Sequence, residues 1–206
     1  MSEPRKIRVM LSALEQASVD EREFSNASLA IRDLCGVSVV RLHTLPQPIA
    51  ETATFGLELP GRTGQCAGDD PAVLCIRPSE WLLISETADA AALALQALSG
   101  APDEIISVQD NSDGFALFRL SGEAAPWLLS KLGGLDYLQG VSSGAHCTRT
   151  KMGHIAVIVH FHQTRQDGWV FDLLLDRSVA KYFWDLLIQS APHAHDLAAE
   201  FRTTLP

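Results

Sequence analysis

The sequence predicts an α+β fold, in which mostly antiparallel strands carry helices on one face of the sheet. Segments rich in β-branched and aromatic residues come in adjacent pairs, which favours antiparallel pairing over single strands between helices. Amphipathic helix patterns follow these pairs after short polar turns. Two β-α-β-β-like units in series further predict two ferredoxin-like lobes. The 206 residues, 47% of them apolar, suit one compact unit or two small lobes that share a core.

We expect the chain to divide into an N-terminal region, residues 1–71, and a body of repeated strand and helix patterns, residues 72–206. Residues 37–44 have the β-branched pattern of a strand. Residues 45–71 contain four prolines and four glycines, so we interpret them as a long loop with a short extended piece at 55–59. A loop of this length in a compact protein is usually functional or packed against a partner.

The body begins with one extended apolar run at residues 73–85, which polar residues interrupt near Glu80, and Trp81 is expected in the core. A helix is predicted over 87–100, with Thr87 or Asp89 as its N-cap and Gly100 at its end.

In the second unit, strand patterns at 105–110 and 115–122 flank the polar segment 110–114. We interpret that segment as a tight hairpin turn, and a polar loop facing a ligand or partner is the alternative. A helix follows over 123–134, with Pro126 near its start and Gly133 at its end.

The third unit predicts a hairpin around Gly153, then a strand at 168–176 and a helix from residue 177. Asp176 or Ser178 is expected to cap that helix. Its predicted buried face consists of Val179, Tyr182, Phe183, Leu186 and Leu187.

The charge pattern excludes several classes of partner. With 25 acidic and 16 basic residues the net charge is −9, which argues against nucleic acid or an anionic membrane as the main partner. No run approaches the ~18 apolar residues of a membrane span, and the N-terminus has no secretory signal pattern. Four widely spaced cysteines without a C-x-x-C pair are typical of thiols in a reducing compartment, so we expect a cytoplasmic protein.

Histidines form the most suggestive cluster of side chains. His154, His160 and His162 have the same parity on one predicted strand, so their side chains would share a face. Such histidines can bind zinc if a third ligand comes from elsewhere, but no Cys, Asp or Glu accompanies them at metal-ligand spacing. We therefore favour a half-exposed strand face that carries imidazoles, and rank the terminal pair His193 and His195 lower.

No other pattern identifies a catalytic, cofactor-binding or metal-binding residue. Nucleotide-binding, phosphate-binding and nucleophile-elbow motifs are absent from the sequence. Arg119, inside an apolar strand, must reach solvent, a carboxylate or an anionic ligand, and solvent is the commonest solution. Glu80 could pair with Arg77 or act as an acid, but a lone carboxylate makes no catalytic site.

A set of short segments has a recognisable pattern when taken together. The segments are Phe55-Gly56-Leu57 with Leu59-Pro60, residues 76–84, 108–114 and 120–129, Cys147-Thr148 with Gly153, and residues 176–180. In this order they resemble the gamma subunit family of heterotetrameric sarcosine oxidase. The resemblance runs from about residue 37 to 190, and Arg77 stands where the family pattern has glycine.

The resemblance implies an accessory, non-catalytic subunit with a fold like the first domains of the glycine cleavage T-protein, an aminomethyltransferase. In that family the complex demethylates sarcosine to glycine, and the one-carbon unit passes to tetrahydrofolate or leaves as formaldehyde. FAD, FMN and NAD are then expected on the alpha and beta partner subunits, with a delta subunit in the complex and no cofactor on this chain. A free-standing folate-binding or aminomethyltransferase-like protein is the alternative.

Overall fold

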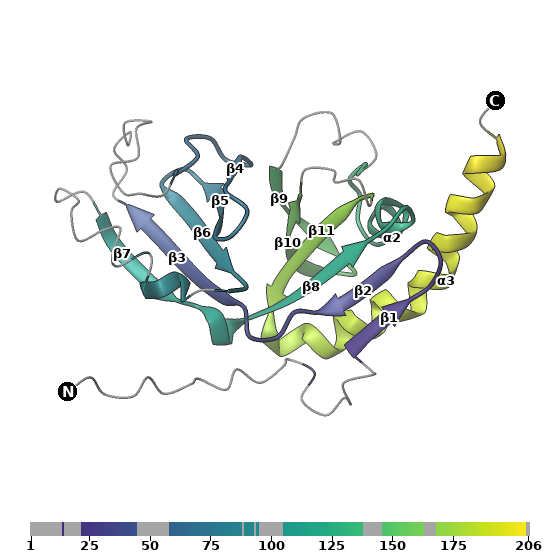
Figure 1. The fold of residues 1–206 in the computed structure, drawn as a ribbon, viewed down its shortest axis with the longest axis horizontal. Helices are drawn as coiled ribbons and strands as arrows, with labels where there is room; N and C mark the ends of the chain where they lie inside the picture. Colours follow the sequence, from purple (N-terminus) through teal and green to yellow (C-terminus); the bar gives the residue numbers. More distant parts are fainter. Residues whose placement is uncertain are drawn as a thin grey trace.

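The computed structural model describes residues 14, 22–44, 58–87, 89–92, 94, 105–137, 146–162 and 168–204. Two antiparallel sheets lie side by side, with helices on the outer face of the larger one (Figure 1). This arrangement confirms the predicted α+β class. The division at residue 71 stays a prediction.

Sheet A has six strands, and all of its strand pairs are antiparallel. In spatial order they are β1 (Glu23–Ser25), β2 (Ala30–Asp33), β8 (Phe115–Ser121), β11 (Val170–Asp176), β10 (Ile155–Phe161) and β9 (His146–Met152). The strands β1 and β2 lie in a region that the sequence patterns left unassigned.

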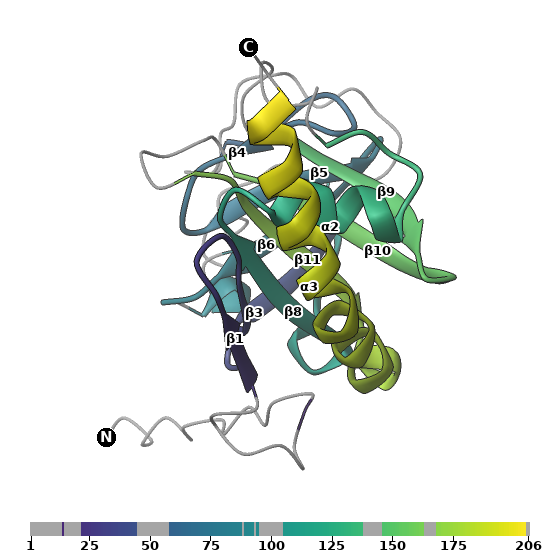
Figure 2. The same ribbon diagram turned by 90° about the vertical axis from the view of Figure 1, so that its right-hand side faces the viewer.

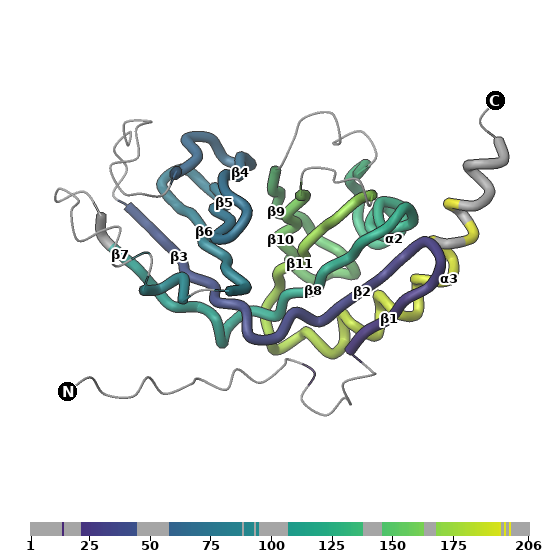
Figure 3. Tube along the Cα trace, in the orientation of Figure 1, coloured from purple at the N-terminus to yellow at the C-terminus, as the bar shows by residue number. Residues whose placement is uncertain are grey.

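Sheet B has five strands, also paired antiparallel throughout. Its spatial order is β4 (Cys66–Ala67), β5 (Ala72–Arg77), β6 (Glu80–Ser85), β3 (Ser38–Thr44) and β7 (Ile105–Asp110). The chain leaves sheet A after β2, builds sheet B, and returns to sheet A through β8 (Figure 3).

The outer face of sheet A is covered by α2 (Ala125–Leu132) and α3 (Ala180–Thr204), which contact each other (Figure 2). Alternate strand residues such as Phe118 and Leu120 point into this core, where the Phe118 ring stacks on Phe183 with centroids 6.4 Å apart. Pro126 lies in the first turn of α2 and Gly133 ends the helix, as predicted.

A second apolar layer lies between the two sheets. The intervening residues of sheet A, including Leu117, Ile158 and Leu174, meet Leu74 and Ile84 of sheet B there. The far face of sheet B packs on a third cluster that includes Ala90 and Ala94.

The predicted helix at 87–100 is described only at residues 90–92 and 94, which are helical. Asp89 Oδ1 accepts a hydrogen bond from Ala92 N at 3.0 Å, so Asp89 is the cap of the two candidates. Gly100 lies outside the described residues, and so do residues 45–57 of the predicted 45–71 loop, Phe55, Gly56 and Leu57 among them.

Two turn predictions are wrong. Residues 73–85 form a hairpin of β5 and β6 rather than one strand, because Ser79 follows Pro78 with φ +61° and reverses the chain. Residues 110–114 do not join paired strands, because β7 belongs to sheet B and β8 to sheet A. This crossover contains the short 3₁₀ helix η2 (Ser112–Gly114), and Val39 N donates to Ser112 Oγ at 2.9 Å, which anchors it.

The hairpin at Gly153 is confirmed. Met152 pairs with Ile155, and the two residues between them have positive φ, +53° at Gly153 and +70° at His154. A Cβ on Gly153 would also lie 2.3 Å from Leu186 Cδ2, so a larger residue there would have to displace the end of that side chain as well as adopt a positive φ.

The start of α3 is confirmed, but its buried face is partly wrong. Asp176 Oδ1 accepts from Ser178 N at 2.8 Å, ahead of the 3₁₀ turn η4 (Arg177–Val179). Tyr182, predicted to be buried, is 56% exposed. The buried stripe instead has the i, i+3, i+4 spacing that starts at Ala180. Its members are Ala180, Phe183, Trp184, Leu187, Ala191, Ala194 and Ala198.

Within the described residues, no helix combines the length and apolarity needed to cross a bilayer. Trp81 is buried as predicted, and its indole Nε1 donates to the carbonyl of Pro60 at 2.8 Å. This bond ties the described end of the long N-terminal loop to sheet B.

Candidate functional site

A row of polar side chains crosses the face of sheet A that points toward sheet B. The antiparallel register sets His160 of β10 opposite Asp172 of β11, and Asp172 opposite Arg119 of β8. On the other side of His160 the register partner is Cys147 of β9. Side chains of directly paired residues lie on the same face of a sheet, so this row is a consequence of strand register.

Asp172 is the centre of the row. Its carboxylate is almost fully buried and accepts from Arg119 Nε at 2.7 Å and from Arg119 Nη2 at 2.8 Å. His162 Nε2 lies 2.6 Å from Asp172 Oδ2. Burial alone would raise the pKa of Asp172, but hydrogen bonds from Arg119 and His162 outweigh it and lower this pKa to about 2. The carboxylate is therefore ionised at neutral pH.

Arg119 links the two sheets. Besides Asp172 it contacts Glu86, just beyond the end of β6, with 2.7 Å between Nη1 and Oε1. Burial opposes the charge on Arg119, yet hydrogen bonds to Asp172 and the nearby Glu86 raise its pKa above the usual value. From the sequence, Arg119 could reach solvent, a carboxylate or an anionic ligand, and solvent was preferred. That preference was wrong, because Arg119 pairs with the carboxylates of Asp172 and Glu86.

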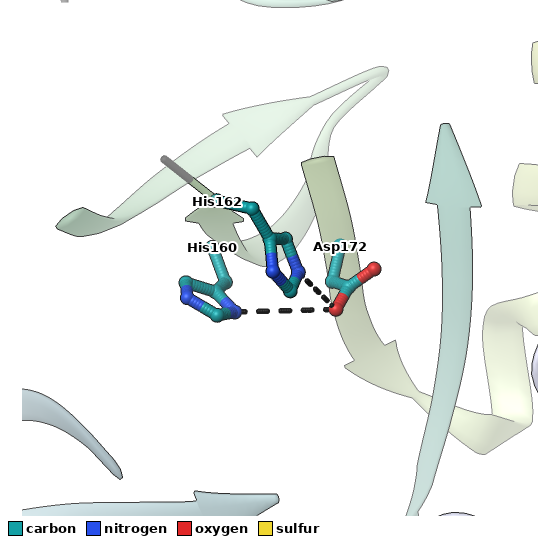
Figure 4. A group of neighbouring side chains, drawn as sticks. All are labelled: His160, His162 and Asp172. Atoms are coloured by element: carbon teal, nitrogen blue, oxygen red, sulfur yellow. Dashed lines mark hydrogen bonds and ion pairs between the residues drawn. The ribbon is translucent and has the colours of Figure 1, made fainter. Parts of the chain in front are cut away.

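His160 and His162 follow each other on the same face at the end of β10 (Figure 4). Their ring centroids lie 4.1 Å apart, and His160 Nδ1 lies 3.9 Å from Asp172 Oδ2. Burial and then the neighbouring His162 lower the pKa of His160 to about 3, so its imidazole is neutral at pH 7. The predicted half-exposed face is wrong for His160, which is 3% exposed.

The structure corrects the histidine prediction in two further ways. His154 is exposed in the hairpin turn and does not join the others, because β10 begins one residue later. A carboxylate does accompany the remaining pair, since Asp172 reaches them across the β10–β11 pairing. That partner could have been found by aligning the two predicted strands as a hairpin. His193 is exposed on α3, and the side chain of His195 is outside the described residues.

Cys66 and Cys147 come together between the two sheets, although their spacing in the sequence gave no sign of it, whereas the Cys75 side chain belongs to the cluster on the far face of sheet B. Cys147 Sγ lies 3.6 Å from the carbonyl oxygen of Cys75, and a hydrogen bond with Cys147, together with burial, raises the pKa of the Cys66 thiol. Cys35 is exposed, and all four are free thiols.

A cavity of about 420 Å³ opens on the same face of sheet A, next to the polar row along β10 and β11. Its apolar lining includes Ile158 and Leu174, the residues that precede His160 and follow Asp172 by two positions. The charged residues that line it are Arg41, Arg149, Lys151 and Asp176. Three cationic side chains around one cavity are a local concentration of positive charge in an acidic chain.

Glu80, the other carboxylate singled out from sequence, forms an ion pair with Arg41, one of the residues that line this cavity. It accepts from Arg41 Nε at 2.7 Å and lies 3.8 Å from Arg77 Nη1. The predicted pairing with Arg77 is therefore present, and Arg41 is the closer partner.

Comparison with solved structures defines the class of fold. A chain of "Heterotetrameric Sarcosine Oxidase from Corynebacterium sp. U-96 in complex with pyrrole 2-carboxylate" matches with a TM-score of 0.72 and 22% identity, over 89% of this chain and 95% of that one. Glycine cleavage system aminomethyltransferase T from Bartonella henselae matches with a TM-score of 0.57 and 13% identity, over 87% of this chain and 50% of that one. The two-sheet α+β fold is thus shared with both proteins.

Family comparison then gives the particular assignment. The model of the sarcosine oxidase, gamma subunit family matches residues 47–193, so the chain belongs to this family. No curated protein sequence matches it.

Proposed function

We propose that the chain is the accessory gamma subunit of a heterotetrameric sarcosine oxidase, with a structural role and no active site of its own. The proposal rests on how much of the chain is covered by the family match and by the structural match to a sarcosine oxidase chain. The family match spans residues 47–193, and the structural match covers nearly all of both chains rather than one shared subdomain.

The chemistry of the described residues supports a non-catalytic role. The ionisable side chains of the polar row are engaged with one another, since Arg119, Asp172 and His162 share hydrogen bonds of 2.6 to 2.8 Å. Such mutual neutralisation accounts for these buried charges without a substrate. The flavins, FAD and FMN, and NAD are then carried by alpha and beta subunits, and tetrahydrofolate would accept the one-carbon unit elsewhere in the complex.

The test is co-expression of the tagged full chain with candidate alpha, beta and delta subunits from the same source. We expect one complex with flavin absorption that forms peroxide when sarcosine is added. Omission of this chain should reduce assembly of the complex, with lower activity following from lost assembly. A colourless chain that purifies without these subunits would contradict the proposal.

The cavity favours a second candidate, a free-standing folate-binding or aminomethyltransferase-like protein. Tetrahydrofolate has a flat ring and an anionic glutamate tail, and the cavity combines an apolar floor with Arg41, Arg149 and Lys151. However, this chain spans only half of the aminomethyltransferase chain that it resembles.

Titration of the isolated full chain with tetrahydrofolate separates the two candidates. Saturable binding that is lost in an Arg149→Ala, Lys151→Ala double variant would support the second candidate. Lys131→Ala is the matched control, because Lys131 is an exposed cation on α2, on the other side of sheet A.

A further inference from the structure

We propose that His160, His162 and Asp172 form a binding site for a divalent transition metal ion, with Zn²⁺ as the ion that fits best. This site goes beyond the proposed function and does not depend on it. Among the residues that the structure describes, these three form a group of potential ligands whose donor atoms all lie within 4.8 Å of one another.

The distances fit a metal after a small adjustment. Zn²⁺ has bonds of ~2.0–2.1 Å to imidazole nitrogen and carboxylate oxygen, so tetrahedral ligand atoms lie roughly 3.3 Å apart. His162 Nε2 is now 2.6 Å from Asp172 Oδ2, and His160 Nδ1 is 3.9 Å from the same oxygen. The first gap must open by about 0.7 Å and the second close by about 0.6 Å, changes of the size that side-chain rotation produces. The two imidazole donors, which lie within 4.8 Å of each other, must also approach.

The protonation states suit coordination. A metal needs neutral imidazoles and an ionised carboxylate. His160 is neutral and Asp172 ionised at pH 7, for the reasons given above. Where His162 Nε2–H now donates to Asp172, the ion takes the place of that proton. The displaced proton leaves to solvent or to Nδ1 of the same ring, and His162 then coordinates through Nε2.

Arg119 strengthens the site rather than blocking it. It donates to both oxygens of Asp172 and leaves the lone pair of Oδ2 that faces His162. A carboxylate has about four acceptor positions, and carboxylate ligands of metals are themselves commonly hydrogen-bonded in this way. Arg119 also forms an ion pair with Glu86. The two carboxylates of Asp172 and Glu86 and the one guanidinium therefore have a net charge of −1, which favours a bound cation.

The surroundings give access and rigidity. His162 is the least buried of the three ligands, with 16% of its side chain exposed, so an ion can enter from its side. His160 and Asp172 are held by the β10–β11 register. Three protein ligands leave a fourth position for water, the arrangement of an open zinc site.

The first experiment titrates the chelator-treated full chain with Zn²⁺ by calorimetry. We expect one ion per chain. His162→Ala and His160→Gln should each weaken binding by more than the roughly 10–100-fold that loss of a supporting outer partner costs. His154→Asn is the matched control with unchanged affinity, because His154 is an exposed histidine outside the site and Asn tolerates its positive φ.

Either of two titration results would overturn the proposal. One is no Zn²⁺ binding to the wild-type chain, and the other is unchanged affinity in the His160→Gln, His162→Ala double variant. If the variants fail to fold, by circular dichroism, the wild-type chain with Co²⁺ decides the question. Tetrahedral d–d bands without thiolate charge transfer support the site. Thiolate bands would assign the ion to cysteine ligands instead and overturn the proposal.

Discussion

The two faces of sheet A are built from alternate residues of the same strands, but they are buried in different ways. Among the described residues, the buried strand positions that face α2 and α3 are apolar, with Phe118, Leu120 and Leu173 as examples. Toward sheet B, the apolar positions Leu117 and Leu174 give way at one end to the charges of the polar row. The helix-facing side gains stability from packing alone, while the sheet-facing side must also neutralise buried charge.

This difference shows where the molecule gives up packing for polar chemistry. Replacing a buried ion pair with apolar residues is often neutral or stabilising, so the pair is not explained by stability. The neighbouring cavity lies on the same face. The space between the sheets is therefore where we expect ligands, while the helix-facing side serves the fold.

The largest effect should come from breaking the buried pair. Arg119→Met leaves the carboxylate of Asp172 buried without its main partner, and we expect a loss of about 3–5 kcal/mol in the free energy of unfolding. Urea denaturation measures it. Arg32→Met is the control, because Arg32 is the cross-strand neighbour of Arg119 but forms an exposed pair with Glu23, worth about 0–1 kcal/mol.

A double variant sharpens this result. Arg119→Met combined with Asp172→Leu removes both charges and should recover most of the lost stability. A double variant as unstable as Arg119→Met alone would show that the polar row contributes through more than mutual neutralisation.

A somewhat smaller effect is expected on the helix-facing side. Leu128→Ala opens a cavity under α2, where Leu128 is fully buried, and should cost about 2–5 kcal/mol. Leu135→Ala, at a residue that is 41% exposed, should change stability by less than ~0.5 kcal/mol. At Arg119 a second substitution, Asp172→Leu, is expected to restore stability. At Leu128 no substitution that removes a neighbouring side chain can do so, because the cavity stays empty.

The effect of His160 is small per pH unit and appears as a pH dependence of stability. Its pKa is about 3 in the folded chain against 6.5 for an unperturbed histidine, so the unfolded chain binds the proton first. Stability is therefore complete above about pH 6.5 and falls as the pH drops toward 3, by about 1.4 kcal/mol per pH unit. The charged or titratable groups that act on it are His162, Asp172, Arg119 and His146.

Thermal or urea unfolding between pH 7 and pH 4.5 measures this dependence. His160→Gln should flatten the slope relative to the wild-type chain. Asp172 loses its own contribution only below its unperturbed pKa of 3.8, so it does not obscure the range. Equal slopes in both proteins would show that His160 is not held neutral by burial.

The sequence predicted the parts of the fold that local patterns control. The hairpin at Gly153, the cap at Asp176 and the strand around Val40 depend on turn chemistry, capping and alternation, which short windows reveal. The segment 110–114 was misinterpreted because a polar turn looks the same whether it joins paired strands or connects two sheets.

The site was predicted only in part, because its geometry is a property of strand pairing. His160 and His162 were found from their spacing, but Asp172 joins them through register, and Cys66 approaches Cys147 through the meeting of the two sheets. Single-sequence patterns carry little information about such long-range partners. The burial of Arg119 likewise followed from its partners and not from its neighbours along the chain.

The strands of sheet B are consecutive along the chain, from β3 to β7. The strands of sheet A come from the segments before and after them, β1 and β2 on one side and β8 to β11 on the other. During synthesis from the N-terminus, all strands of sheet B are available once Asp110 has left the ribosome. Asp33, by contrast, must wait for its partner Phe118, and β8 must then wait for β11. In nascent chains stalled at increasing lengths, the strands of sheet B should therefore become protected from proteolysis first. The hairpin of β1 and β2 should remain accessible to protease until β8 to β11 have been synthesised.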